Sequence, residues 1–93
     1  MTVTIRLPGP LRELAGGRSV IELEAHVHTA GEALSAMRHR YPAVYDRIIT
    51  EQGEVRPHVN VFVGNDTIQA VAGLATPLDA DSEIVILPAV SGG

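Results

Sequence analysis

Glu83-Ile84-Val85-Ile86-Leu87 is the stretch that decides the fold of this chain. After Glu83 it is apolar on both parities, as expected of a strand whose two faces are both covered at least part of the time. We therefore predict that it lies near the centre of a sheet, beside the first strand of the chain. It then continues through Pro88 into a short neutral segment that ends in Gly92-Gly93.

Two segments near the N-terminus predict a hairpin. Residues 2–7 alternate between polar and apolar side chains, and Pro8-Gly9-Pro10 ends this strand. A short apolar turn and Gly16-Gly17 follow, and residues 18–24 alternate again. Two neighbouring strands joined by a modest loop favour antiparallel pairing.

A helix is predicted to begin after Thr29. Thr29-Ala30-Gly31-Glu32 has the form of a capping box, in which the threonine hydroxyl accepts from the Glu32 amide and the glutamate returns to the cap amide. Four apolar side chains share one side of this helix at helical spacing: Ala30, Ala33, Leu34 and Met37. Tyr41-Pro42 stops the helix, and residues 44–49 suggest a further short helical turn.

The second half of the chain holds a third clear strand at residues 58–63, rich in β-branched side chains and bounded by the turn Gly64-Asn65-Asp66. Residues 67–69 could pair weakly after that turn. Residues 70–81 are irregular.

The order strand, strand, helix, strand, short strand, strand predicts an α+β layer pair. We expect a mixed sheet of four to five strands with one main helix packed on one face, which is the β-grasp, or ubiquitin-like, fold. Residues 1–87 form this domain, and residues 88–93 form a flexible C-terminal Gly-Gly tail.

Strand alternation assigns side chains to the two faces of the sheet. The residues expected to face the helix are Val3, Ile5, Leu7, Val59, Val61, Val63, Ile84 and Ile86. Phe62, Val85 and Leu87 then point to the other face, where an exposed apolar patch beside a tail is typical of a docking surface for a partner. The alternative is that a loop such as residues 70–81 covers this patch.

Length, composition and charge exclude several classes of function. Ninety-three residues fit one domain, and no apolar run is long enough to span a membrane. The alternating N-terminus shows no secretory signal, which predicts a cytoplasmic protein. A net charge of −4 and scattered basic residues give no footprint for nucleic acid.

The chain lacks both cysteine and lysine, because its seven basic side chains are all arginines. The missing cysteine excludes disulfides, thiolate metal sites and cysteine nucleophiles. The missing lysine would protect an activated C-terminal acyl group from attack by an ε-amine. A GC-rich coding bias that favours arginine explains the same composition.

The terminal Gly92-Gly93 offers an unhindered carboxylate that passes through channels too narrow for side chains. Residues 88–93 could span roughly 20 Å when extended. The carboxylate can therefore enter another protein's active site while the folded body stays outside.

Four segments match a known family: Val59-Asn60-Val61-Phe62-Val63 with the Asn-Asp turn after it, Gly73-Leu74-Ala75-Thr76-Pro77-Leu78, Asp79-Ala80-Asp81-Ser82-Glu83, and Ile86 to Gly93. With them the chain resembles the ubiquitin-like sulfur carriers, which include the small subunit of molybdopterin synthase, the thiamine-pathway carrier and the carrier of a cysteine-synthesis route. It is most similar to the last of these. Ala80 and Ser91 stand where the family usually has glycine and alanine, which bears on subfamily and turn geometry more than on mechanism.

The resemblance implies that an E1-like partner, an enzyme of the ubiquitin-activating type, uses ATP to convert the Gly93 carboxylate to an acyl-adenylate. A sulfide or persulfide then displaces AMP and leaves a thiocarboxylate at Gly93, whose sulfur passes to a sulfur-accepting synthase. A metalloprotease is a further partner in such pathways. The chain is then a protein cosubstrate and not an enzyme, with no stably bound cofactor and no metal. Its acceptor pathway (cysteine, molybdopterin, thiamine or a secondary metabolite) is left open.

The residues expected to carry this function fall into two sets. Gly92 and Gly93 carry the chemistry. The residues expected to contact partners are Phe62, Val85, Leu87, Pro88, Ala89, Val90 and Ser91.

Two other functions fit the same residues: a ubiquitin-like modifier joined to other proteins through Gly93, and a β-grasp interaction module whose diglycine is incidental. His26 and His28 lie two apart but have no evident third metal ligand, so ordinary surface histidines explain them better.

Overall fold

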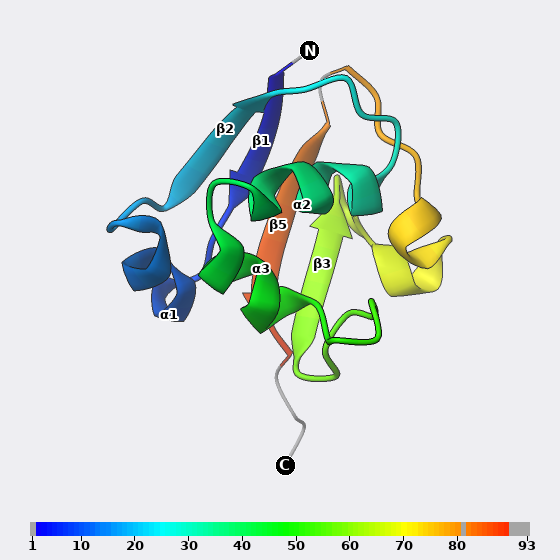
Figure 1. Cartoon of the computed structure of the whole chain (residues 1–93). Helices are drawn as coiled ribbons and strands as arrows, with labels where there is room; N and C mark the ends of the chain where they lie inside the picture. Colours follow the sequence, from blue (N-terminus) through cyan, green and yellow to red (C-terminus); the bar gives the residue numbers. More distant parts are fainter. Residues whose placement is uncertain (1, 81, 90–93) are drawn as a thin grey trace.

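A computed structural model describes residues 2–80 and 82–89, and its elements follow the predicted order, including the short helix expected near residues 44–49, with one further short helix added near the N-terminus (Figure 1). The elements are β1 (Thr2–Arg6), α1 (Gly9–Arg12), β2 (Val20–Glu24), α2 (Ala30–Arg38), α3 (Pro42–Ile48), β3 (Val59–Val63), β4 (Asp66–Thr67) and β5 (Glu83–Pro88). Three single 3₁₀ turns complete the list: Glu13–Ala15 after α1, Ile68–Ala70 after β4, and Gly73–Ala75 in the segment that leads to β5.

The sheet has the order β2-β1-β5-β3-β4. The last strand, β5, runs parallel to β1 and antiparallel to β3, so it occupies the centre, and β1 forms the predicted antiparallel hairpin with β2. The mixed sheet, its central last strand and the α+β layering confirm the predicted β-grasp arrangement.

The core lies between the sheet and the helices, which all lie on one side of it (Figure 1). Ile5 of β1, Val61 of β3 and Ile84 of β5 are fully buried there. The apolar side of α2 packs onto them, with Ala30, Ala33, Leu34 and Met37 each fully buried. Val63, expected on this face, is only partly buried because it lies near the edge of the cluster.

The start of α2 has the predicted threonine cap with one change. The Glu32 amide donates to the Thr29 hydroxyl over 3.2 Å. The Glu32 carboxylate accepts from the amide of His28, 2.7 Å away, and not from the cap amide as predicted. The glutamate therefore ties the helix to the residue that precedes the cap, which fixes the entry of the chain into α2.

The segment at residues 70–80 packs against the start of α2. The Ala30 amide donates to the Thr76 carbonyl, and the Leu78 amide donates to the His28 carbonyl, each over 2.9 Å. Gly31 is close enough to Leu74 that an added Cβ would lie 3.0 Å from its side chain and carbonyl. This segment therefore belongs to the helix side of the sheet, and the alternative in which it covers Phe62, Val85 and Leu87 is wrong for its described residues.

Three local predictions need correction. The apolar turn at residues 11–15 is a short helix followed by a 3₁₀ turn, and Leu14 is partly exposed while Leu11 is buried. Only Asp66 and Thr67 pair after the β3 turn, because residues 68–70 already form a 3₁₀ turn. The helix α2 ends at Arg38, before the predicted stop at Tyr41-Pro42, and Pro42 instead begins α3, which fits the preference of proline for the first helical turn.

Candidate functional site

The face of the sheet turned away from the helices, here called the open face, carries the predicted apolar patch. Phe62 of β3 pairs directly with Val85 of β5, and both are half-buried. Leu87 lies two residues further along β5 on the same face and is 43% exposed. The three side chains that sequence alternation brings together therefore do form one surface, at the point where β5 leads toward the tail.

Along β1 and β2 the open face is mostly polar, and Val20, opposite Arg6, is the apolar exception. Arg6, opposite Val85, forms an ion pair with Glu83 on the same face. Thr2 of β1 donates its hydroxyl hydrogen to the Glu24 carboxylate of β2, and this bond is the largest cause of a lowered pKa at Glu24. The apolar patch is therefore bordered along β1 and β2 by charged and hydroxyl groups.

The base of the tail is held by backbone contacts. Pro88 is the last residue of β5 and is paired with Val59 of β3, one residue beyond the predicted domain boundary. The Ala89 amide then donates to the His58 carbonyl over 2.9 Å. From Ala89 to Gly93, four extended residues would reach about 14 Å. The reach expected from residues 88–93 is shortened accordingly.

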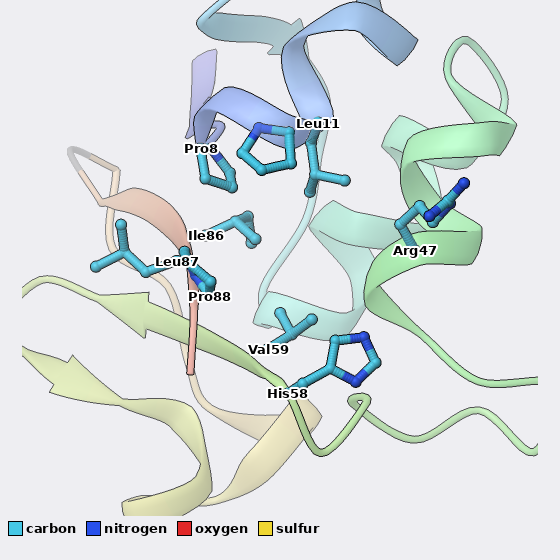
Figure 2. Close-up of a pocket in the computed structure, with 9 residues that line it drawn as sticks. Pro8, Leu11, Arg47, His58, Val59, Ile86, Leu87 and Pro88 are labelled. Carbon is cyan, nitrogen blue, oxygen red and sulfur yellow. The ribbon is translucent and has the colours of Figure 1, made fainter. Parts of the chain in front are cut away.

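A small apolar cavity of about 160 Å³ lies beside this point, on the helix side of the sheet. Figure 2 shows that its labelled walls come from four separate segments: Pro8 and Leu11 at α1, Arg47 on α3, His58 and Val59 at the start of β3, and Ile86 to Pro88 at the end of β5. Pro88 has the same parity in β5 as the buried Ile84 and Ile86, so its side chain lies on the opposite face of the sheet from the apolar patch.

The predicted site residues are thus divided by the structure. Phe62, Val85 and Leu87 share the open face, and Leu87 also reaches the rim of the cavity. Pro88 and Ala89 form the base of the tail. The remaining predicted residues, Val90, Ser91, Gly92 and Gly93, lie outside the described residues.

Sequence reasoning missed the cavity and its basic rim. Arg47 and His58 have no relation in sequence to the tail, and their proximity to Pro88 depends on how α3 and the start of β3 pack at this end of the sheet. The one available signal was the pair of prolines at residues 8 and 88, which come at the carboxyl ends of two strands predicted to be neighbours in the sheet.

Other candidate sites do not assemble among the described residues. His26 and His28 join no group of three His, Cys, Asp or Glu side chains placed to bind a metal ion in residues 2–80 and 82–89. Within the same residues, every helix is too short or too polar to cross a bilayer.

Comparison with a family model matches residues 5–93 to the ThiS family. Among curated proteins, the chain is 32% identical to small archaeal modifier protein 3 of Haloferax volcanii, with each chain covered completely. It is 30% identical to the sulfur carrier protein CysO of Mycobacterium tuberculosis, again over the full length of both.

Solved structures of a sulfur carrier and of a small modifier are also similar to this chain. CysO from the Amycolatopsis orientalis BexX/CysO complex is similar with a TM-score of 0.83 and 28% identity, covering 98% of this chain and 99% of the other. SAMP1 from Haloferax volcanii gives a TM-score of 0.80 and 29% identity over the full length of both chains. The neighbours therefore include both sulfur carriers and small modifiers.

Proposed function

Because the chain belongs to the ThiS family, we propose that it is a sulfur carrier whose Gly93 carboxylate is activated by a partner enzyme and converted to a thiocarboxylate. The observation that supports this most directly is the extent of the family match, which runs through Gly92-Gly93. The full-length similarity to a sulfur carrier protein adds support.

The chemistry needs nothing from the body of the chain except a free carboxylate. ATP bound by the partner gives an acyl-adenylate at Gly93 and releases pyrophosphate. Sulfide, or a persulfide followed by reduction, displaces AMP and leaves the thiocarboxylate. The thiocarboxylate is ionised at neutral pH and serves as the nucleophile toward an acceptor on a second enzyme, so the chain acts as a cosubstrate and does not catalyse the reaction itself.

The open face has the properties needed to choose the partner. Leu87 and Pro88 join the apolar patch to the tail within one strand, so a protein that docks on Phe62 and Val85 receives the tail in a fixed direction. The complex formed by the Amycolatopsis CysO with BexX supports the view that a carrier of this shape is received by a second protein. An adenylating enzyme, a sulfur-accepting synthase and, in some pathways, a metalloprotease are the proposed partners.

The test is intact-mass analysis after incubation with ATP, sulfide and the adenylating enzyme encoded in the same genome. We expect the replacement of one oxygen by sulfur at Gly93. Deletion of Gly93 should abolish the change completely. Leu87→Asp should slow it about tenfold or more by removing an apolar contact at the interface, while Ser35→Asp, on the exposed side of α2, should leave it unchanged. Unchanged mass in the wild-type chain, with the enzyme shown to be active on ATP, would contradict the proposal.

A second candidate is conjugation to other proteins, which the similarity to small archaeal modifier protein 3 favours specifically. The acyl-adenylate that precedes the thiocarboxylate is also the electrophile that a target lysine would attack. Covalent adducts that disappear when Gly92-Gly93 is deleted would establish this role, and the two roles are compatible. A plain interaction module would show neither adducts nor sulfur and would tolerate loss of Gly93. The cytoplasmic location remains a prediction.

A further inference from the structure

The cavity at the carboxyl end of β5 has apolar walls. Leu11, Val59 and Ile86 line it and are each no more than 9% exposed. Pro8, which follows β1, and Pro88 add two rigid rings, and Pro88 is exposed, so the cavity reaches the surface. Its volume of about 160 Å³ is close to the roughly 150 Å³ at which an apolar cavity holds a molecule the size of benzene. One leucine, isoleucine or phenylalanine side chain therefore fits it.

The rim of this cavity is basic, although the whole chain carries a net charge of −4. Arg47 of α3 and His58, just before β3, both line it, and both are exposed (Figure 2). Its lining residues in the described part of the chain include no Asp or Glu. Within residues 2–80 and 82–89, neither Arg47 nor His58 forms an ion pair. A guanidinium and an imidazole N–H both donate hydrogen bonds to carboxylates, so the cavity suits an apolar group with a carboxylate beside it.

The cavity and the apolar patch lie on opposite faces of the same strand end. Val85 and Leu87 belong to the open face, whereas Ile86 and Pro88 line the cavity. A protein that contacts both faces holds the end of β5 from two sides, directly before the tail. Sites for free small molecules usually measure about 300–1,000 Å³, so the size of this cavity favours a single side chain carried by a docked protein.

We propose that this cavity receives one apolar side chain of the enzyme that takes up the tail, and that carboxylates next to that side chain pair with Arg47 and His58. This inference rests on the proposed function for the identity of the partner. It adds a second contact, of stated chemistry, to the docking surface on the open face. The complementary feature of the partner is a loop in which an apolar residue is flanked by Asp or Glu.

The first test uses no enzyme and takes three acetylated, amidated tripeptides as probes. They are Asp-Phe-Asp, Asn-Phe-Asn, which lacks the charges, and Asp-Ala-Asp, which lacks the ring. The full chain, labelled with ¹³C at its methyl groups, is titrated with each peptide, and the methyl signals of Leu11 and Val59 report on the cavity. We expect saturable shifts with Asp-Phe-Asp, binding of Asn-Phe-Asn that is weaker by about threefold or more, and no saturable shift with Asp-Ala-Asp.

Arg47→Glu reverses the charge at the rim on an exposed position, so the fold should be kept. We expect it to weaken the binding of Asp-Phe-Asp by about threefold or more and to leave that of Asn-Phe-Asn nearly unchanged. Arg18→Glu is the matched control, because Arg18 is also exposed but does not line the cavity. It should have little effect on either peptide.

The proposal is overturned if Asp-Phe-Asp produces no saturable shift at Leu11 and Val59. It is also overturned if the charged and uncharged peptides bind equally well and Arg47→Glu changes neither. Binding that begins only after deletion of residues 90–93 would make the chain's own tail the occupant. Shifts at the cavity that depend on protein concentration without peptide would make a second copy the occupant, and either result rejects the proposal.

The second test uses the enzyme that forms the thiocarboxylate. Arg47→Glu should raise the KM for the carrier by about threefold or more with kcat little changed, because the contact is made before and during the reaction alike. Arg18→Glu should leave the KM unchanged. An unchanged KM in Arg47→Glu would reject this enzyme as the source of the side chain. If the wild-type chain forms no thiocarboxylate, the proposed function fails, and the peptide titration still decides whether the cavity binds an acidic, apolar segment.

Discussion

Neighbouring residues of β5 face opposite sides of the sheet, and the two sides have different surroundings. Ile84 and Ile86 are buried in the core with residues of α2 and α3, whereas Val85 is half-buried and Leu87 is 43% exposed. One strand therefore supplies buried core side chains on one face of the sheet and, on the other face, the exposed apolar side chains of the proposed docking surface. Substitutions on the two parities should separate these properties.

The largest expected effect is a loss of stability on truncating a side chain from the buried face of β5. Ile84→Ala removes a fully buried side chain from the central strand and should lower the free energy of unfolding by about 2–5 kcal/mol. The measurement is chemical denaturation followed by circular dichroism. Val85→Ala, one residue along on the open face, is the matched control and should cost less than half as much. Equal losses at the two positions would mean that the open face is packed as tightly as the core.

A smaller loss of stability should show that residues 70–80 pack against the start of α2 on the helix side of the sheet. Gly31→Val places a branched side chain where even a Cβ would lie 3.0 Å from Leu74, so the segment must shift. We expect a loss of about 1–3 kcal/mol from overpacking. Ser35→Val, on the exposed side of the same helix, measures the helix propensity cost alone. Similar losses for the two variants would show that the contact with Leu74 adds nothing.

The smallest effect lies on the polar part of the open face. Thr2→Val removes the hydroxyl that holds the pKa of Glu24 below its ordinary value, so that pKa should rise. A carboxylate with a lowered folded pKa contributes stability above its unfolded pKa of about 4.3, and this contribution is lost as pH falls through the folded pKa. The variant should therefore lose less stability in acid than the wild type.

The pKa change is measured by NMR titration of the Glu24 side chain. Thr4→Val is the control, because Thr4 lies on the same face of β1 and is paired with Glu22. An unchanged Glu24 pKa in Thr2→Val would show that the hydroxyl does not set it.

Much of the fold followed from local patterns. The apolar run at Ile84–Leu87 predicted a central strand, and the spacing of Ala30, Leu34 and Met37 predicted the buried side of α2, because both depend on periodicity within one element. The same alternation placed Phe62 and Val85 on the open face. The bond from His28 to Glu32 was missed because it depends on how the chain enters the helix and not on the capping pattern itself.

The features that were not predicted depend on contacts between distant segments. Pro8, Arg47, His58 and Pro88 meet at one cavity, although 80 residues separate the first from the last. No periodicity links such positions, and their meeting depends on the register of β1, β3 and β5 together. The hydrogen bond from the Ala89 amide to the His58 carbonyl has the same origin.

The central place of β5 also has a consequence for biosynthesis. β1 leaves the ribosome first, yet its inner neighbour in the sheet is the last strand of the chain, so the core cannot close until residues 83–88 have emerged. A nascent or prematurely terminated chain that lacks them has no central strand and exposes the apolar edges of β1 and β3. Folding is thereby coupled to completion of the segment that precedes the tail, and we expect copies that end before residue 83 to stay unfolded and open to proteolysis.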